Sequence, residues 1–423
     1  MNILIVSYNW PPRNAMGTHR GVAWANSWSN SGNSVTVLTS KKQRFDGNLD
    51  LIDLHVSCEV EVIEVQYLSV VKRALFQILA IPFINKLAKL VHRTNKVYSG
   101  ISEAVRNRWV EAAQDKIDAS QFDLVISSFG PEASHLLAAK LKLKHERLFW
   151  VADYRDLWSL NPNFAYTNDE MRQSIDRESK VVNDANLIST VSKGFADKLQ
   201  LQYPDVEVII SKNGHDFEDK AILKNIQSHD DCIKKEEFRI IYTGNYYPNT
   251  QLIDPFLVAT DSLLGELKEK KTLILEVYGE RVDGIKKAQE RLGCKIKIRY
   301  FGHIARHLAL QRQRDADLLL MCESNDDMSG VIPGKLYEYI CSGTPILCVG
   351  PSKNSEMGQI ISETGTGLAA GINTSLITTS LASLINEGRF MCFDPNFNKI
   401  IKYSRKNQSI DLLRDIKKHI DIR

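Results

Sequence analysis

The sequence predicts an α/β protein built from two doubly wound parallel sheets, each in its own domain. The chain has 423 residues, of which 43% are hydrophobic and 25% charged, so it is long enough for two domains with full cores. Short apolar runs alternate with turns and helical patterns, which is typical of a parallel sheet covered by helices on both faces. These runs form two series, separated by a polar stretch at 216–236.

The first series of apolar runs contains NILIVSY, SVTVLTS, FDLVISSF, LFWVADY, ANLISTVS and EVIISKNG. The second contains FRIIYTG, LILEVYG, CKIKIRYFG, ADLLLMCES, TPILCVG and GLAAG. We therefore predict a first domain at 1–212, a linker at 213–236, a second domain at 237–390 and a helical segment at 391–423. The last segment has apolar residues near the helical period, so we expect it to pack back on the first domain.

Composition excludes several classes of partner and site. The net charge of +3 is nearly balanced, so we expect no nucleic-acid partner. The seven cysteines are odd in number, widely spread and contain no CxxC pair, which disfavours a disulfide framework and a zinc site. The N-terminal MNILIVSYNWPP has no basic region and resembles a buried strand rather than a signal peptide. These features favour the cytoplasm.

Residues 68–96 interrupt the alternation with a basic amphipathic pattern. Apolar residues mix with lysines and arginines too often for a transmembrane span, and Pro82 divides the segment into two predicted helices. Such a hairpin suits an anionic membrane surface, at the inner face of the cytoplasmic membrane. The alternative is a pair of helices that pack on the first domain and leave a charged face in solvent.

The stretch SGVIPGKLYEYICSG, which begins at Ser329, has the features of an anion site where a loop becomes a helix. Gly334 permits a close approach of backbone to a ligand, and the predicted helix directs free N–H groups outward. Lys335 adds a positive charge for a phosphate, and Glu338, one turn later, can accept hydrogen bonds from a ribose diol. The alternative is a solvated Lys and Glu in an ordinary loop. We expect Lys335 to be exposed and to add little to folding stability.

This stretch resembles the donor-binding element of nucleotide-sugar glycosyltransferases of the GT-B architecture, especially family 4. Other segments agree in order along almost the whole chain: YNWPPRNAMGTHR, FDLVISSFGPEASHLLAAKLKLK, LFWVADYRDLWS, ISTVSKGFADKL, IISKNGHD, IIYTGNY, EVYGE, FGHI and ETGTGLAAG. Each motif is short, but their common order is specific to this family.

The resemblance implies two Rossmann-like domains that face each other across a cleft. It implies transfer of a hexosyl or N-acetylhexosaminyl group from a nucleotide diphosphate sugar to an acceptor hydroxyl, with retention of configuration. The acceptor would be lipid-linked or an oligosaccharide, in the synthesis of a cell-surface polysaccharide such as capsule, O-antigen or another part of lipopolysaccharide. No metal and no cofactor beyond the donor substrate is implied.

The resemblance also assigns residues to the donor. Lys335 would stabilise the departing diphosphate as a catalytic cation. The donor-binding residues would be Gly17, Gly244, Asn245, Gly279, Arg281, Ser329, Gly330, Val331, Gly334, Lys335 and Glu338.

The segment VADYRDLWS is the second predicted catalytic position. Asp153, Arg155 and Asp156 follow a predicted strand; Arg155 could hold the donor or an acidic acceptor, and either aspartate could orient the acceptor hydroxyl or act as base. The alternative is a structural Asp–Arg ion pair. His19 and His135 are candidates for the acceptor side, although a packing histidine fits His135 at least as well.

Three departures from the family pattern leave other activities open. Gly330 stands where many members have glutamate, Asn245 and Asn249 replace an Arg and Lys pair, and Asn14-Ala15 replaces Gly-Gly. A sugar-nucleotide-binding subunit without catalysis, or a sugar-nucleotide epimerase of the same architecture, are the alternatives to a transferase.

Overall fold

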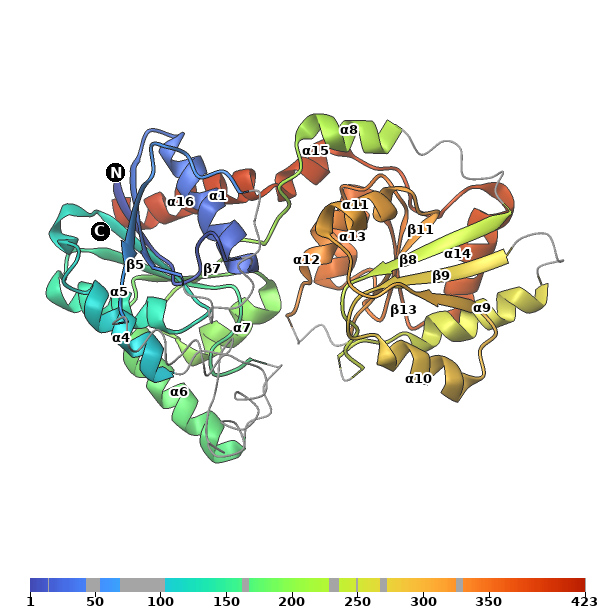
Figure 1. The fold of residues 1–423 in the computed structure, drawn as a ribbon, viewed down its shortest axis with the longest axis horizontal. Helices are drawn as coiled ribbons and strands as arrows, with labels where there is room; N and C mark the ends of the chain where they lie inside the picture. The colour runs from blue at the N-terminus through green and yellow to red at the C-terminus, as the bar shows by residue number, and fades with distance from the viewer. Residues whose placement is uncertain are drawn as a thin grey trace. The chain divides into compact units, whose positions relative to one another are not determined.

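The computed structural model describes residues 1–13, 15–42, 54–68, 103–161, 167–227, 236–248, 250–266, 272–324 and 330–422 (Figure 1). The chain divides into two compact units. The first unit contains Met1–Asn213 and Arg405–Arg423, and the second contains Gly214–Ser404. The predicted basic segment at 68–96 lies outside the described residues, apart from Leu68.

The first unit is a seven-stranded parallel sheet with the order β3-β2-β1-β4-β5-β6-β7. Its strands are β1 (Asn2–Val6), β2 (Ser34–Ser40), β3 (Glu61–Val65), β4 (Leu124–Ser128), β5 (Phe149–Tyr154), β6 (Leu187–Thr190) and β7 (Val208–Ile210). Its helices are α1 (Met16–Ser29), α4 (Glu103–Ala113), α5 (Ala133–Lys144), α6 (Asn168–Val182), α7 (Lys193–Gln202) and α16 (Arg405–Asp421). The strand order reverses at β1, as in a doubly wound fold.

The second unit repeats this topology with six parallel strands in the order β10-β9-β8-β11-β12-β13. The strands are β8 (Glu237–Thr243), β9 (Thr272–Tyr278), β10 (Lys297–Tyr300), β11 (Leu318–Cys322), β12 (Ile346–Val349) and β13 (Gly367–Gly371). The helices are α8 (Asp219–Gln227), α9 (Asp254–Glu266), α10 (Asp283–Leu292), α11 (Arg306–Arg314), α12 (Gly334–Tyr339), α13 (Glu356–Thr364), α14 (Thr374–Glu387) and α15 (Phe397–Ile400). The predicted fold class, α/β with two doubly wound sheets, is confirmed.

Each sheet has a buried core on both of its faces. On β1, Leu4 and Val6 belong to one buried cluster, whereas Ile3 and Ile5 belong to the other. A strand that is buried on both faces needs a continuous apolar run rather than an alternating one. The strands have continuous apolar sequences because helices cover both faces of each sheet, and this is why the sequence predicts them.

The C-terminal helix α16 packs on α1 of the first unit, and Figure 1 shows the two helices side by side. Leu412, Leu413 and Ile416 are buried in the same cluster as Trp28, whose Nε1 donates to the Ser409 carbonyl at 2.8 Å. An apolar face and a buried hydrogen bond therefore hold α16 on the first unit.

His419 links α16 to Glu207 of the first unit, and we expect this contact to depend on pH. Its Nδ1 lies 2.7 Å from the carbonyl oxygen of Asp415, and its Nε2 lies 3.1 Å from Oε2 of Glu207. The Asp415 carbonyl raises the pKa of His419 above its usual value; burial opposes this, and Glu207 adds to it. A raised folded-state pKa means that the stabilisation is complete below the unfolded-state value of about 6.5 and is lost as pH rises through the folded-state pKa.

We therefore expect His419→Gln to lower the free energy of unfolding by up to about 1 kcal/mol near pH 5.5, and by less near pH 9. Urea unfolding of the variant and the wild type at both pH values measures this difference. An equal loss at the two pH values would show that the histidine contributes by packing alone.

Two predicted boundaries differ from the structure. The segment predicted as a linker at 213–236 contains α8, whose Ile222 is fully buried in the second unit, and Asn225 Nδ2 donates to the Cys341 carbonyl at 2.9 Å. The segment predicted to begin at 391 contains α15, and its Ile400 is also buried in the second unit. Each segment therefore contributes at least one side chain, Ile222 or Ile400, to the core of the second unit.

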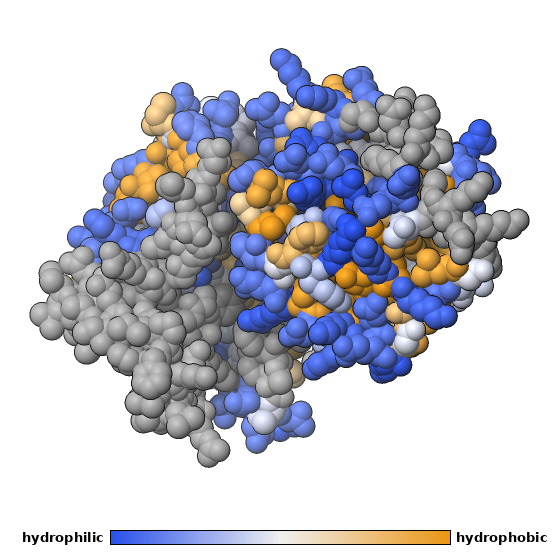
Figure 2. Space-filling model, turned by 45° about the vertical axis from the view of Figure 1, so that its right-hand side comes forward, coloured by the Kyte–Doolittle hydropathy of each residue, from blue (hydrophilic) through white to orange (hydrophobic). Residues whose placement is uncertain are grey.

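On the face of the described residues that Figure 2 shows, hydrophilic side chains surround several apolar patches. Exposed apolar side chains are normal in folded proteins. Within the described residues, no helix has the length and the apolar character that crossing a membrane requires.

Candidate functional site

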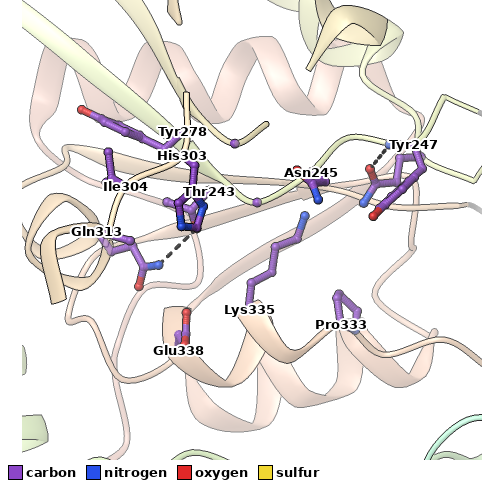
Figure 3. A pocket seen from close by; sticks show the side chains of 14 residues that line it. Thr243, Asn245, Tyr247, Tyr278, His303, Ile304, Gln313, Pro333, Lys335 and Glu338 are labelled. Atoms are coloured by element: carbon purple, nitrogen blue, oxygen red, sulfur yellow. Dashed lines mark hydrogen bonds between the residues drawn. The ribbon is translucent and has the colours of Figure 1, made fainter. Parts of the chain in front are cut away.

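The second unit contains a pocket of about 380 Å³ at the carboxyl ends of β8 and β9, beside α11 and α12 (Figure 3). In a doubly wound fold this edge of the sheet, near the point where the strand order reverses, is the usual place for a ligand. The pocket is lined by Thr243, Gly244, Asn245, Tyr247, Gln251, Tyr278, Gly279, His303, Ile304, Ala309, Gln313, Pro333, Lys335 and Glu338. Five residues predicted to bind the donor therefore lie in one pocket, namely Gly244, Asn245, Gly279, Lys335 and Glu338.

Two glycines let the strand ends meet at the floor of this pocket. A Cβ atom at Gly279 would lie 2.2 Å from the carbonyl oxygen of Gly244, a distance that no side chain tolerates. Gly244 has a φ of +104°, which L-residues rarely adopt. Asn245 joins the same two loops, because its Oδ1 accepts from the backbone N–H groups of Glu280 and Arg281, both at 3.1 Å.

Lys335 is largely buried, in contrast to the exposed lysine that the sequence predicted. Its side chain is only 12% exposed, and its Nζ lies 3.1 Å from Oε1 of Glu323 and 3.1 Å from the hydroxyl of Tyr242. The ammonium also lies 4.3 Å from the centre of the Tyr242 ring. The prediction was wrong because α12 begins against the end of β11, where Glu323 draws the ammonium inward.

The charge of Lys335 is secured by these partners. Burial alone would lower the pKa of Lys335, but Tyr242 and Glu323 outweigh it, so the pKa lies well above the usual value. An ammonium carries three N–H donors, of which Glu323 and Tyr242 take two. Lys335 is therefore a fixed cation with a donor to spare for a ligand.

Glu323 and Gln251 complete this network, and neither residue was predicted to have a role. Gln251 Nε2 donates to Oε1 of Glu323 at 3.0 Å, and Tyr242 donates from its hydroxyl to the Asn245 carbonyl at 2.9 Å. Glu323 follows the apolar run of β11 directly. A carboxylate at the carboxyl end of a buried strand is the signal that could have identified it.

Glu338 lies at another part of the pocket from the Lys335 ammonium, although both residues belong to α12. In Figure 3 the ammonium points toward Asn245, whereas Glu338 and Gln313 lie on the opposite side of the view. Arg306 of α11 donates from its Nε to Oε1 of Glu338 at 3.0 Å. This ion pair, and the polar lining residue Gln313, were not predicted either.

The remaining predicted donor residues have other positions. Gly330 and Val331 lie in the loop before α12, and Gly334 is the first residue of that helix. Arg281 has an exposed side chain and is not among the described residues that line the pocket. Ser329 lies outside the described residues, as does Asn249.

In the first unit, Asp153 has the geometry of the structural ion pair that the sequence left as an alternative. It lies on β5 with 0% exposure, and Arg20 donates to it twice, from Nη2 to Oδ1 at 2.7 Å and from Nε to Oδ2 at 3.1 Å. Ser189 Oγ donates to Oδ1 at 2.8 Å. A carboxylate whose two oxygens are bound by a buried arginine does not suit the role of a base that an acceptor must reach.

Arg155 and Asp156, at the end of β5, pair with each other instead. Arg155 Nη2 lies 2.6 Å from Oδ2 of Asp156, and a Cβ atom at Gly17 would lie 3.7 Å from Arg155 Nε. Gly17 belongs to the first turn of α1, and His19 follows it there. The structure therefore brings Gly17, Arg155 and Asp156 into one neighbourhood of the first unit.

His135 does not suit the acceptor side, because it is a core residue. It is fully buried on α5, and its Nδ1 lies 2.7 Å from Ser127 Oγ, which accepts from Trp150 Nε1 at 2.9 Å. Burial lowers the pKa of His135 to about 3, so the ring is neutral at physiological pH. This geometry fits the alternative prediction of a packing histidine.

Comparison with known proteins identifies the fold. No protein-family model matches the sequence, and no curated protein matches it. Among solved structures, sucrose-phosphate synthase from Thermosynechococcus elongatus is 10% identical with a TM-score of 0.63 over 100% of both chains. Anabaena HepE in complex with UDP and glucose is 12% identical with a TM-score of 0.55, over 99% of both chains.

The lipopolysaccharide outer core galactosyltransferase WaaB, in its apo form, is likewise 12% identical with a TM-score of 0.57, over 99% of both chains. The likeness extends over both units of the chain in all three cases. The chain therefore shares with these glycosyltransferases their two-domain fold, GT-B.

Proposed function

We propose that this protein is a retaining glycosyltransferase that takes a sugar from a nucleotide diphosphate sugar and transfers it to an acceptor hydroxyl. The observation that carries the proposal is the pocket of the second unit, which combines a fixed cation, Lys335, with a carboxylate, Glu338, at the switch-point edge of a doubly wound sheet. A diphosphate needs the cation, and a ribose diol suits the carboxylate.

The same geometry fits the chemistry of sugar transfer. As the sugar leaves, negative charge accumulates on the departing diphosphate, and a preorganised cation stabilises that charge without reorganisation. Glu323 and Tyr242 hold the Lys335 ammonium in place before any ligand arrives. Gly244 and Gly279 place no side chain at the strand ends, so backbone can approach the phosphates there.

We assign the acceptor side to the first unit, at Arg155 and Asp156. Asp156 is the more accessible of the two aspartates that the sequence proposed, since Asp153 is enclosed by Arg20. Arg155 orients Asp156 through their 2.6 Å contact. In this proposal Asp156 orients the acceptor hydroxyl.

The biological setting of the proposal is the synthesis of a cell-surface polysaccharide on a lipid-linked or oligosaccharide acceptor. Its support is the set of family 4 motifs, and the likeness in fold to WaaB, a galactosyltransferase of the lipopolysaccharide outer core, and to HepE with UDP and glucose. The basic segment at 68–96 would attach the enzyme to an anionic membrane surface. We propose no metal and no cofactor for the reaction.

Thermal unfolding in the presence of UDP, GDP and dTDP, and of their sugar conjugates, tests the proposal. A ligand at 100 times its dissociation constant should stabilise the protein by about 2.7 kcal/mol. Nucleoside monophosphates serve as controls, because they lack the second phosphate that Lys335 is proposed to bind. If none of the nucleotide diphosphates raises the unfolding temperature, the proposed function is wrong.

Product analysis with the nucleotide sugar that binds separates the transferase from the two alternatives. A transferase releases the nucleoside diphosphate and forms a glycoside, or slowly hydrolyses the donor to the free sugar and the nucleoside diphosphate. An epimerase returns an isomerised donor without any acceptor. A binding subunit returns the donor unchanged.

A further inference from the structure

Gln313 is a buried polar side chain whose acceptor atom has no partner. It lines the pocket, is only 1% exposed, and is the buried residue of α11. Its Oε1 has no hydrogen-bond partner among the described residues. A buried acceptor without a partner destabilises a folded protein, so such a group points to a ligand that supplies the missing donor.

A hydrogen bond to Thr243 fixes the orientation of the Gln313 side-chain amide. Gln313 Nε2 donates to Oγ1 of Thr243 at 3.1 Å. Thr243 is in turn held by Tyr339, whose hydroxyl accepts from the Thr243 backbone N–H at 2.9 Å. Because Nε2 of Gln313 is bound to Thr243, Oε1 remains available to accept from a ligand in the pocket. This oxygen is shielded from water before the ligand binds.

The same face of α11 also holds Glu338. Arg306, Ala309 and Gln313 are spaced three and four residues apart, which places them on one side of the helix. Ala309 and Gln313 line the pocket, and Arg306 binds the lining residue Glu338 at 3.0 Å. This end of the pocket therefore offers two acceptors, the Glu338 carboxylate and Gln313 Oε1 (Figure 3).

We propose that this face of α11 recognises the ribose of the nucleotide: Gln313 Oε1 accepts a hydrogen bond from one hydroxyl of the 2′,3′-diol, and Arg306 positions Glu338 to accept from the other. The inference rests on the proposed function, which puts the diphosphate at Lys335 and hence the ribose next to it. Two adjacent O–H donors of the diol match two acceptors. The protein thus selects ribonucleotide donors and rejects dTDP-sugars, which lack the 2′-hydroxyl.

Binding of UDP and GDP, each compared with its 2′-deoxy and 3′-deoxy forms by isothermal titration, tests the inference. The wild type should bind the parent nucleotide at least about tenfold more tightly than either deoxy form. Gln313→Met should abolish the preference at one of the two hydroxyls and retain it at the other. Gln311→Met is the matched control, because it makes the same change at an exposed position of α11.

Arg306→Ala provides a second variant that does not endanger folding, since the Arg306 side chain is 52% exposed. It should weaken the preference at the hydroxyl that Gln313→Met leaves intact, because Glu338 loses its support. Arg306→Lys should restore part of that preference.

The outcomes separate the inference from the proposed function. If the wild type binds UDP or GDP but binds the deoxy forms equally well, or if Gln313→Met keeps both preferences, the inference fails and the proposed function stands. If no nucleotide diphosphate binds to the wild type, both fail.

Discussion

Lys335→Met is expected to abolish nucleotide binding and to reduce sugar transfer by at least about 10²-fold to 10³-fold. Loss of one preorganised donor to a developing negative charge has an effect of this size in other enzymes. Among the residues that the structure describes, Lys335 is the only lysine or arginine that lines the pocket. The measurement is turnover of the donor, together with the shift in unfolding temperature that the nucleotide produces.

Because Lys335 pairs with a buried carboxylate, the experiment needs a second variant in which that carboxylate is neutralised as well. The single substitution leaves the Glu323 carboxylate, which is 9% exposed, without its cation, and breaking a buried pair in this way costs about 3–5 kcal/mol. In the double variant Lys335→Met with Glu323→Gln no buried charge remains unpaired. We expect that protein to recover most of the wild-type stability and still fail to bind a nucleotide.

The matched control for this experiment is Lys353→Met, because Lys353 is an exposed lysine of the same unit. It should bind and turn over the donor as the wild type does. Normal turnover by the folded double variant would show that Lys335 takes no part in the mechanism.

Asp153→Ala is expected to destabilise the first unit by about 3–5 kcal/mol, because it leaves Arg20 buried without its carboxylate partner. All six tryptophans of the chain lie in the first unit, so their fluorescence reports the unfolding of that unit separately. The urea midpoint of tryptophan fluorescence should fall, whereas nucleotide binding to the second unit at low urea should persist.

A double variant tests whether the role of Asp153 is structural. Arg20→Met together with Asp153→Leu removes both charges, and replacement of a buried ion pair by apolar residues is often neutral or stabilising. We expect its midpoint to lie well above that of Asp153→Ala. A catalytic base would behave differently: Asp153→Asn would fold like the wild type and lose turnover.

Most strands could be predicted from the sequence, because residues such as Ile3 to Val6 are buried on both faces and form unbroken apolar runs. The exception is β3, at the edge of the first sheet, where Glu61, Val62 and Glu64 leave the strand largely exposed. Its sequence EVIEV lacks the continuous run, so the criterion that found its neighbours missed it. The helix α8 was missed for a related reason, since Ile222 and Ile226 reach the core from a segment in which polar residues predominate.

The position of the pocket could be predicted, but the contacts within it could not. The motif around Lys335 and the strand ends at Gly244 and Gly279 indicate where a ligand would bind, because parallel strands end at a common edge. The pairing of Lys335 with Glu323, and of Glu338 with Arg306, depends on side chains from different elements that meet only after folding. A pattern along the chain carries no information on such pairs.

The contact between Gly244 and Gly279 determines where the pocket can be altered by engineering. Because a methyl group at 279 would collide with the carbonyl oxygen of Gly244 at 2.2 Å, directed evolution of the two strand ends would mainly return unfolded proteins. Arg306 and Ala309 of α11 have no such constraint, since Arg306 is half exposed and Ala309 is small. A library aimed at new donor nucleotides should therefore vary these two positions and leave the glycines unchanged.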